Sequence, residues 1–300
     1  MKNTRSNQNS DVSGASDIQT PVRGVTARCL AAGLILAAGA AQAAVLNSQE
    51  LAANFGSVNQ NAVFGPGIGP NGNNSCAPTA NMNAFTFLQN TYQGVYGNDG
   101  LGNPALQGGQ GSWTGAAIQL ALNMGTTSAG GTSVAGWVNG TVGWFNTYAP
   151  GTTAYAGMGA TVGGHPWLAA GAPTPAFLYS QLQANEGVEL AIFPVAGIGH
   201  VLTLTGISWN NLAGGMNYGG TDTMSLNTID PGNPGVNTAL SFNPGTLTIN
   251  GGAYNGYTLG IAIAQSPVPE TSTTIAGGLT MGLVLLVVLR KNRTAAAPAV

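Results

Sequence analysis

Charge is the scarcest property of this 300-residue sequence. Lys, Arg, Asp and Glu together make up 5% of the chain, whereas about 25% is typical of globular proteins. A nucleic-acid-binding protein needs Lys and Arg to contact phosphates, so the composition excludes that class. It also argues against a disordered chain, because such chains are highly charged and poor in apolar residues, whereas 44% of these residues are hydrophobic.

Positive charge is missing from most of the chain, since residues 29–289 contain no Lys or Arg. The charged residues of that stretch are all acidic: Glu50, Asp99, Glu186, Glu189, Asp222, Asp230 and Glu270. The formal net charge of -2 therefore combines two basic ends with an acidic middle. Both basic ends lie next to apolar runs, which predicts targeting or sorting segments rather than parts of the folded domain.

Cysteine and histidine are scarce as well, with two residues of each. Cys29 lies near the N-terminus, so Cys76 is alone in the rest of the chain, which excludes an internal disulfide there. Structural zinc sites need several Cys or His ligands, and Cys76 with His165 and His200 is too small a set. We therefore expect neither a metal nor a cofactor.

The N-terminus has the order of a secretory signal peptide. Arg23 and Arg28 precede an apolar run over residues 29–40, and the small-residue pattern Ala41-Gln42-Ala43 follows. This order predicts a signal peptide over residues 1–43, with the export machinery and signal peptidase as partners. An uncleaved N-terminal anchor is the alternative.

The C-terminus carries a second apolar run, over residues 275–289, which is followed by the basic residues Arg290, Lys291 and Arg293. A helix of this length spans roughly 22 Å, less than the roughly 30 Å hydrocarbon core of a bilayer. The run therefore predicts a short transmembrane helix that holds the chain in the membrane before processing. The basic cluster and residues 294–300 should stay cytoplasmic, so the middle of the chain is expected outside the inner membrane.

Residues 267–293 resemble the PEP-CTERM sorting signal, which consists of a Val-Pro-Glu-Pro motif, an apolar helix and a basic cluster. Val268, Pro269 and Glu270 match the motif, and Thr271 replaces its second Pro. The resemblance implies a Gram-negative, exopolysaccharide-producing bacterium and processing by an exosortase, a membrane cysteine transpeptidase, near Pro269. It implies a location in the cell envelope or outside the cell. An ordinary C-terminal anchor is the alternative.

Residues 44–266 are long enough for one domain. Apolar spacing predicts helices over 76–90, 113–124 and 175–185 and strands over 188–195, 201–207, 223–229, 246–249 and 257–264. Helices followed by successive strands indicate an α+β domain with an antiparallel sheet. We interpret the similar segments Gly136-Trp137-Val138-Asn139 and Gly143-Trp144-Phe145-Asn146 as a local similarity rather than a solenoid repeat.

Cys76 is the candidate nucleophile, because it lies at the predicted start of a helix, where the helix dipole stabilises a thiolate. Such a thiol needs a base, and the base needs an orienting group. His200 directly precedes the strand 201–207, which is a more rigid position than the loop that holds His165. Asp230 follows the next strand and is the candidate orienting carboxylate.

The segment from Asn74 to Ala80 resembles the Cys-Gly-Pro-Ala helix start of papain-like bacterial cysteine peptidases, especially those related to the double-glycine bacteriocin-processing peptidases. Gly199-His200 before a hydrophobic strand and Asp230-Pro231 at a strand end resemble the other two motifs of that group. The resemblance implies a papain-like α+β fold with an N-terminal nucleophile helix and an antiparallel sheet. It also implies a triad of Cys76, His200 and Asp230 that acts on a peptide substrate.

Two positions depart from that pattern. Ala77 replaces the usual Gly after the nucleophile, and no Gln precedes Cys76 at the spacing of the family's oxyanion-hole residue. Asn71, Asn73 and Asn74 are the candidate side-chain donors, together with the backbone N–H of Cys76. Two functions follow from these observations: an exported thiol hydrolase, or a non-catalytic cell-surface or biofilm-matrix protein that retains the papain-like fold.

Overall fold

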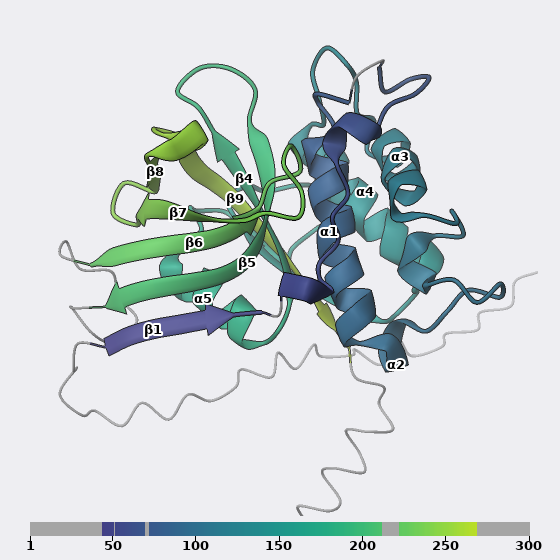
Figure 1. Cartoon of the computed structure of the whole chain (residues 1–300), viewed down its shortest axis with the longest axis horizontal. Coiled ribbons are helices and arrows are strands. Elements are labelled where there is room, and N and C mark those ends of the chain that lie inside the picture. Colours follow the sequence, from purple (N-terminus) through teal and green to yellow (C-terminus); the bar gives the residue numbers. More distant parts are fainter. Residues whose placement is uncertain (1–43, 51, 70–71, 212–221, 269–300) are drawn as a thin grey trace, which may run out of the picture. The chain divides into compact units, whose positions relative to one another are not determined.

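The computed structural model describes residues 44–50, 52–69, 72–211 and 222–268 (Figure 1). Its helices are α1 (Cys76–Thr91), α2 (Gln93–Tyr96), α3 (Trp113–Asn123), α4 (Val134–Tyr148) and α5 (Pro175–Gln183). Its strands are β1 (Ala44–Gln49), β2 (Thr153–Met158), β3 (Leu168–Ala169), β4 (Gly187–Phe193), β5 (His200–Asn211), β6 (Thr223–Ile229), β7 (Asn237–Asn243), β8 (Thr248–Asn250) and β9 (Thr258–Pro267). Short 3-10 helices join some of them, including η4 (Gly252–Tyr254).

Within the described residues, the strands form one nine-stranded sheet that closes on itself. Strands β5, β6, β7, β8 and β9 pair in that order, and β4 pairs with both β5 and β9, which completes a six-stranded barrel. Strand β1 extends β5 outside the ring, and β2 and β3 continue the sheet from β9. Among these pairs, only the short contact between β2 and β3 is parallel.

The predicted papain-like α+β fold is wrong, because the strands form a mostly antiparallel sheet that closes into a six-stranded barrel. The sequence pattern indicates successive strands beside a nucleophile helix, and it gives no sign of closure. Closure depends on the pairing of β4 with β9, which joins residues such as Val188 and Ala264. Hydrophobic spacing reports the character of each strand but not its distant partner. Strands β1, β2, β3 and β7 are likewise not among the predicted elements.

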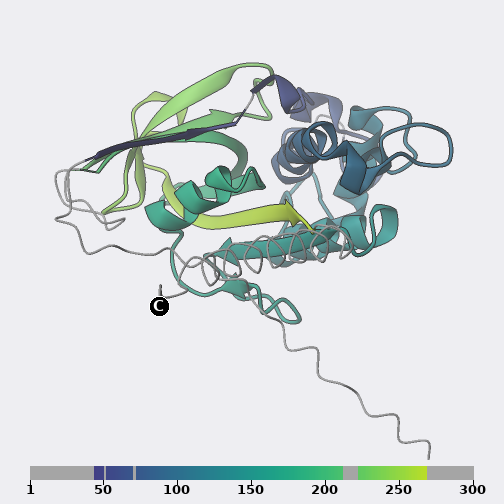
Figure 2. The same cartoon turned by 90° about the horizontal axis from the view of Figure 1, so that it is seen from below.

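Two hydrophobic cores lie on the two faces of the barrel strands. Side chains alternate between the faces of a strand. In β5, Leu202 and Leu204 therefore point into the barrel core, which α5 also contacts through Leu178. Val201 and, in β4, Ala191 face the other way and pack in the core that contains α1, α3 and α4. Figures 1 and 2 show these three helices together at one side of the barrel, with α5 apart from them.

Helix α4 contains both Gly-Trp segments, so the two similar segments within residues 136–146 are successive stretches of one helix. A spacing of seven residues is about two helical turns, and both Trp137 and Trp144 are buried. The sequence pattern does not predict this helix, because glycine disfavours helix interiors. Its glycines are required by packing: a Cβ at Gly136 would lie 2.2 Å from the carbonyl oxygen of Met124, and one at Gly140 would lie 2.4 Å from the Met124 side chain.

Candidate active site

Cys76 is the first residue of α1, and its side chain is partly buried against the helical core. The preceding Ser75 does not cap the helix, because its hydroxyl instead donates to the carbonyl of Val63 at 2.9 Å. The first backbone bond of the helix runs from the N–H of Thr79 to the carbonyl of Ser75. The N–H groups of Cys76 and Ala77 therefore have no acceptor within the helix, and they favour negative charge beside the sulfur.

His200 and Asp230 meet because their strands are antiparallel neighbours. His200 is the first residue of β5, and Asp230 directly follows the last residue of β6. The register pairs Thr203 with Ile229, which brings the two strand ends together. Nε2 of His200 lies 3.0 Å from Oδ1 of Asp230. Since an ionised carboxylate only accepts hydrogen bonds, Nε2 carries the proton in this contact.

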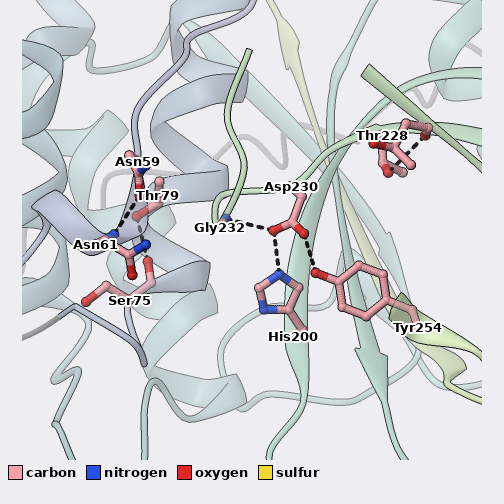
Figure 3. Close-up of polar contacts among 10 residues, drawn as sticks. Asn59, Asn61, Ser75, Thr79, His200, Thr228, Asp230, Gly232 and Tyr254 are labelled. Atoms are coloured by element: carbon pink, nitrogen blue, oxygen red, sulfur yellow. Dashed lines mark hydrogen bonds and ion pairs between the residues drawn. The ribbon is translucent and has the colours of Figure 1, made fainter. Parts of the chain in front are cut away.

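The side chains of Cys76 and His200 border the same cavity. Because Nε2 is engaged with Asp230, Nδ1 is the ring nitrogen that remains for the thiol, and Figure 3 shows this nitrogen pointing away from Asp230. Burial by itself lowers the pKa of His200, but the hydrogen bond with Asp230, the side-chain interaction with Cys76 and the charges of both groups raise it to about 9. The imidazole is therefore protonated at neutral pH and can pair with a thiolate.

Asp230 accepts three hydrogen bonds (Figure 3). Oδ1 accepts from His200 and from the backbone N–H of Gly232 at 2.7 Å, and Oδ2 accepts from the hydroxyl of Tyr254. Burial opposes ionisation, but these three donors outweigh it and lower the pKa of the Asp230 carboxyl. Asp230 is thus a negative, fully engaged partner of His200, as an orienting residue must be.

The sulfur and the imidazole open into a cavity of about 260 Å³. Cys76 and Ala77 of α1 border this cavity, as do His200 at the start of β5 and the preceding residue Gly199. The other residues that line it are Asn73, Asn74, Gly131, Thr132, Val134, Trp137, Ala191, Phe193, Ile198, Val201, Tyr254 and Tyr257. Its walls are mostly apolar, and no Lys, Arg, Asp or Glu is among these lining residues. A small group can thus reach the thiol in mostly apolar surroundings.

The predicted oxyanion donors have different positions. Asn71 lies outside the described residues, whereas Asn73 and Asn74 both border the cavity. The amide of Asn74 already donates to the carbonyl of Ser128, which leaves Asn73 as the more available side-chain donor of the two. The backbone N–H of Cys76 is its natural partner at the helix start.

His165 does not join the site. Its Nε2 lies 2.7 Å from Oδ1 of Asn139, and its ring packs edge-on to Trp167. Asn139 belongs to α4, so this contact ties the loop that contains His165 to the helical side of the molecule. His165 therefore has a structural partner of its own.

The predicted targeting and sorting segments fall largely outside the described residues. These are the signal peptide over 1–43, the sorting motif beyond Val268 (Pro269 and Glu270), the apolar run 275–289, the basic cluster Arg290, Lys291 and Arg293, and the tail 294–300. Val268 itself donates its backbone N–H to the carbonyl of Thr152 at 2.7 Å. None of the helices in the described part of the chain is long and apolar enough to cross a membrane.

Tyr254 is a site residue that the sequence does not reveal. Its hydroxyl donates to Asp230, and its ring stacks on His200 with centroids 5.2 Å apart and planes inclined by 20°. It lies in η4, a short turn between β8 and β9. No motif marks this position, because the contact exists only once the barrel brings that turn beside β5.

The described ranges contain no group of three or more His, Cys, Asp and Glu residues that could hold a metal ion. The residues that line the cavity offer one thiol and one imidazole but no carboxylate.

Comparison with known proteins adds no family. The sequence matches no protein-family model, and a search of curated proteins gives no significant match.

Proposed function

We propose that this protein is a thiol-dependent hydrolase of amide or ester bonds, in which Cys76 is the nucleophile, His200 the general acid and base, and Asp230 the residue that orients His200. One observation carries the proposal: the His200 imidazole borders the same cavity as the thiol at the start of α1, and it hydrogen-bonds a carboxylate that is held by two further donors. This is the arrangement that activates a thiol.

The reaction follows from these positions. The Cys76 thiolate attacks the carbonyl carbon of the substrate, and the N–H of Cys76 and the Asn73 side chain are the proposed donors to the oxygen that becomes negative. The imidazolium of His200 then gives its proton to the leaving amine or alcohol, which leaves an acyl group on the sulfur. His200 then removes a proton from water, which attacks the thioester, and the acid product departs as the thiolate and the imidazolium reform. A peptide is the expected substrate.

Export and sorting belong to the same proposal. The signal-peptide pattern over 1–43 and the PEP-CTERM-like segment over 267–293 support secretion across the inner membrane, processing by an exosortase, and a final location in the cell envelope or outside the cell. An enzyme with this placement would act on extracytoplasmic substrates. Mass spectrometry of the mature protein should find its first residue at Ala44 and its last near Pro269.

Alkylation tests the chemistry directly. In the full chain carrying Cys29→Ser, iodoacetamide at pH 6 should label Cys76 of the native protein, because the imidazolium stabilises the thiolate. His200→Ala should slow labelling at least about tenfold, and the matched variant His165→Ala should label like the parent. The proposal fails if Cys76 labels only after denaturation, or equally fast without His200. Such a result would favour a non-catalytic surface protein.

A further inference from the structure

Tyr254 is held in place independently of the groups that it contacts in the site. Its backbone carbonyl accepts from the N–H of Tyr257 at 3.0 Å, which closes the turn between β8 and β9. The two tyrosine rings meet edge to face, with centroids 5.4 Å apart and planes at 72°. Tyr257 also borders the cavity. The Tyr254 side chain is thus fixed from the barrel side before it reaches the site.

Its two contacts restrain different degrees of freedom. The hydroxyl bond to Oδ2 holds the plane of the Asp230 carboxylate, because Oδ1 is already shared by His200 and Gly232. The stacked ring restrains the imidazole, whose plane is inclined by 20° to the phenol plane. Nε2 of His200 and the carboxylate thereby stay in line.

Tyr254 also lies between two cavities. Asp230 and Tyr254 border a second cavity of about 350 Å³, whose other walls include the polar residues Asn233 and Thr238. Oδ2 of Asp230 accepts from the phenol hydroxyl. The hydroxyl occupies this acceptor and keeps the carboxylate directed at His200.

We propose that Tyr254 is a positioning residue, whose hydroxyl fixes the Asp230 carboxylate and whose ring fixes the plane of His200. The effect on turnover rests on the proposed function, whereas the effect on His200 does not. Among the described residues, the ionisable groups around the imidazole are Cys76 from α1, Asp230 after β6, Tyr254 from η4 and Tyr257, which borders the same cavity. The Tyr254 hydroxyl and the His200 imidazolium both donate to the Asp230 carboxylate. Loss of the hydroxyl should therefore strengthen the attraction between Asp230 and the imidazolium.

The test compares Tyr254→Phe, which keeps the ring and removes the hydroxyl, with Tyr179→Phe. The latter removes a hydroxyl that accepts from Gln183 in α5, away from the site. Nitrogen-15 NMR of the full chain should show a higher pKa of His200 in Tyr254→Phe and no change in Tyr179→Phe, with His165 as the internal reference. Hydrolysis of p-nitrophenyl acetate should show a kcat about tenfold lower in Tyr254→Phe only, as expected for the loss of one hydrogen bond to a charged group.

A His200 titration in Tyr254→Phe that matches the parent overturns the proposal. If the parent does not hydrolyse the ester, the proposed function fails, and the titration alone still decides the role of Tyr254. If Tyr254→Phe does not fold, replacement of all tyrosines by 3-fluorotyrosine gives the opposite test. The more acidic phenol is a stronger donor to Asp230, so the pKa of His200 should fall, and an unchanged pKa contradicts the proposal.

Discussion

Glu50 should make the stability of this protein fall as the pH rises. Its side chain is only 4% exposed, and neither carboxylate oxygen has a hydrogen-bond partner among the described residues. Burial, and secondarily the charge of Glu186, raises its pKa from 4.5 to about 9. The folded protein therefore holds a proton on Glu50 at neutral pH that the unfolded chain releases.

The size of the effect follows from this difference. Between pH 4.5 and 9 the folded state binds more protons than the unfolded state, so the free energy of unfolding decreases as the pH rises through this window. Protonating a Glu that would otherwise be ionised costs about 1.4 kcal/mol for each pH unit above its ordinary pKa of about 4.5. At pH 7 this cost lowers the free energy of unfolding by about 3 kcal/mol. Typical domains have a total stability of only about 5–15 kcal/mol, so the cost is large.

Glu50→Gln replaces the protonated carboxyl with a neutral group of similar shape. Urea unfolding, followed by the fluorescence of the buried tryptophans, should show a gain of about 3 kcal/mol at about pH 7 and less than about 1 kcal/mol at about pH 5. Asp99→Asn is the control, since the hydrogen bonds of Asp99, above all with Asn103, outweigh the effect of burial and lower its pKa. The reasoning is refuted if Glu50→Gln has the same slope of stability against pH as the parent between about pH 5 and 8.5.

Three further substitutions test the site and the helical side. Asp230→Asn should lower the pKa of His200, which NMR titration can measure, and should slow ester hydrolysis by about a hundredfold or more, because the imidazolium loses its carboxylate partner. Ser133→Ala removes the hydroxyl that caps α4, and urea unfolding should show a loss of about 1 kcal/mol. Asn81→Ala leaves the buried indole N–H of Trp137 without its acceptor, and the same assay should show a loss of about 2 kcal/mol.

The parts of the site with local signals could be predicted from the sequence. Cys76 begins a helix, His200 begins a strand, and Asp230 follows the next strand, and each of these element ends is marked by the residues around it. Because β5 and β6 are antiparallel neighbours, the start of β5 lies beside the end of β6, and His200 and Asp230 come together. The catalytic role of the three residues remains a prediction, although they lie together in the structure.

The fold could not be predicted in the same way. A ring of six strands depends on pairings between distant residues, above all those of β4 with β9, and these leave no periodic trace. Helix α4 is hidden by its glycines, whose purpose is visible only when the neighbouring Met124 is in place. Tyr254 escapes prediction for a related reason, since it reaches His200 only across the closed barrel.

The site lies where the barrel meets the helices, and this boundary decides which contacts control its geometry. His200, Asp230 and Tyr254 all come from barrel strands or the turns between them, whereas Cys76 comes from α1. The distance from the thiol to the imidazole is therefore set by how α1 packs on β4 and β5. One bond fixes this packing directly, since the buried hydroxyl of Thr203 in β5 donates to the carbonyl of Ala80 in α1 at 2.9 Å. Barrel closure orders the acid–base pair, and the attachment of α1 brings the nucleophile to it.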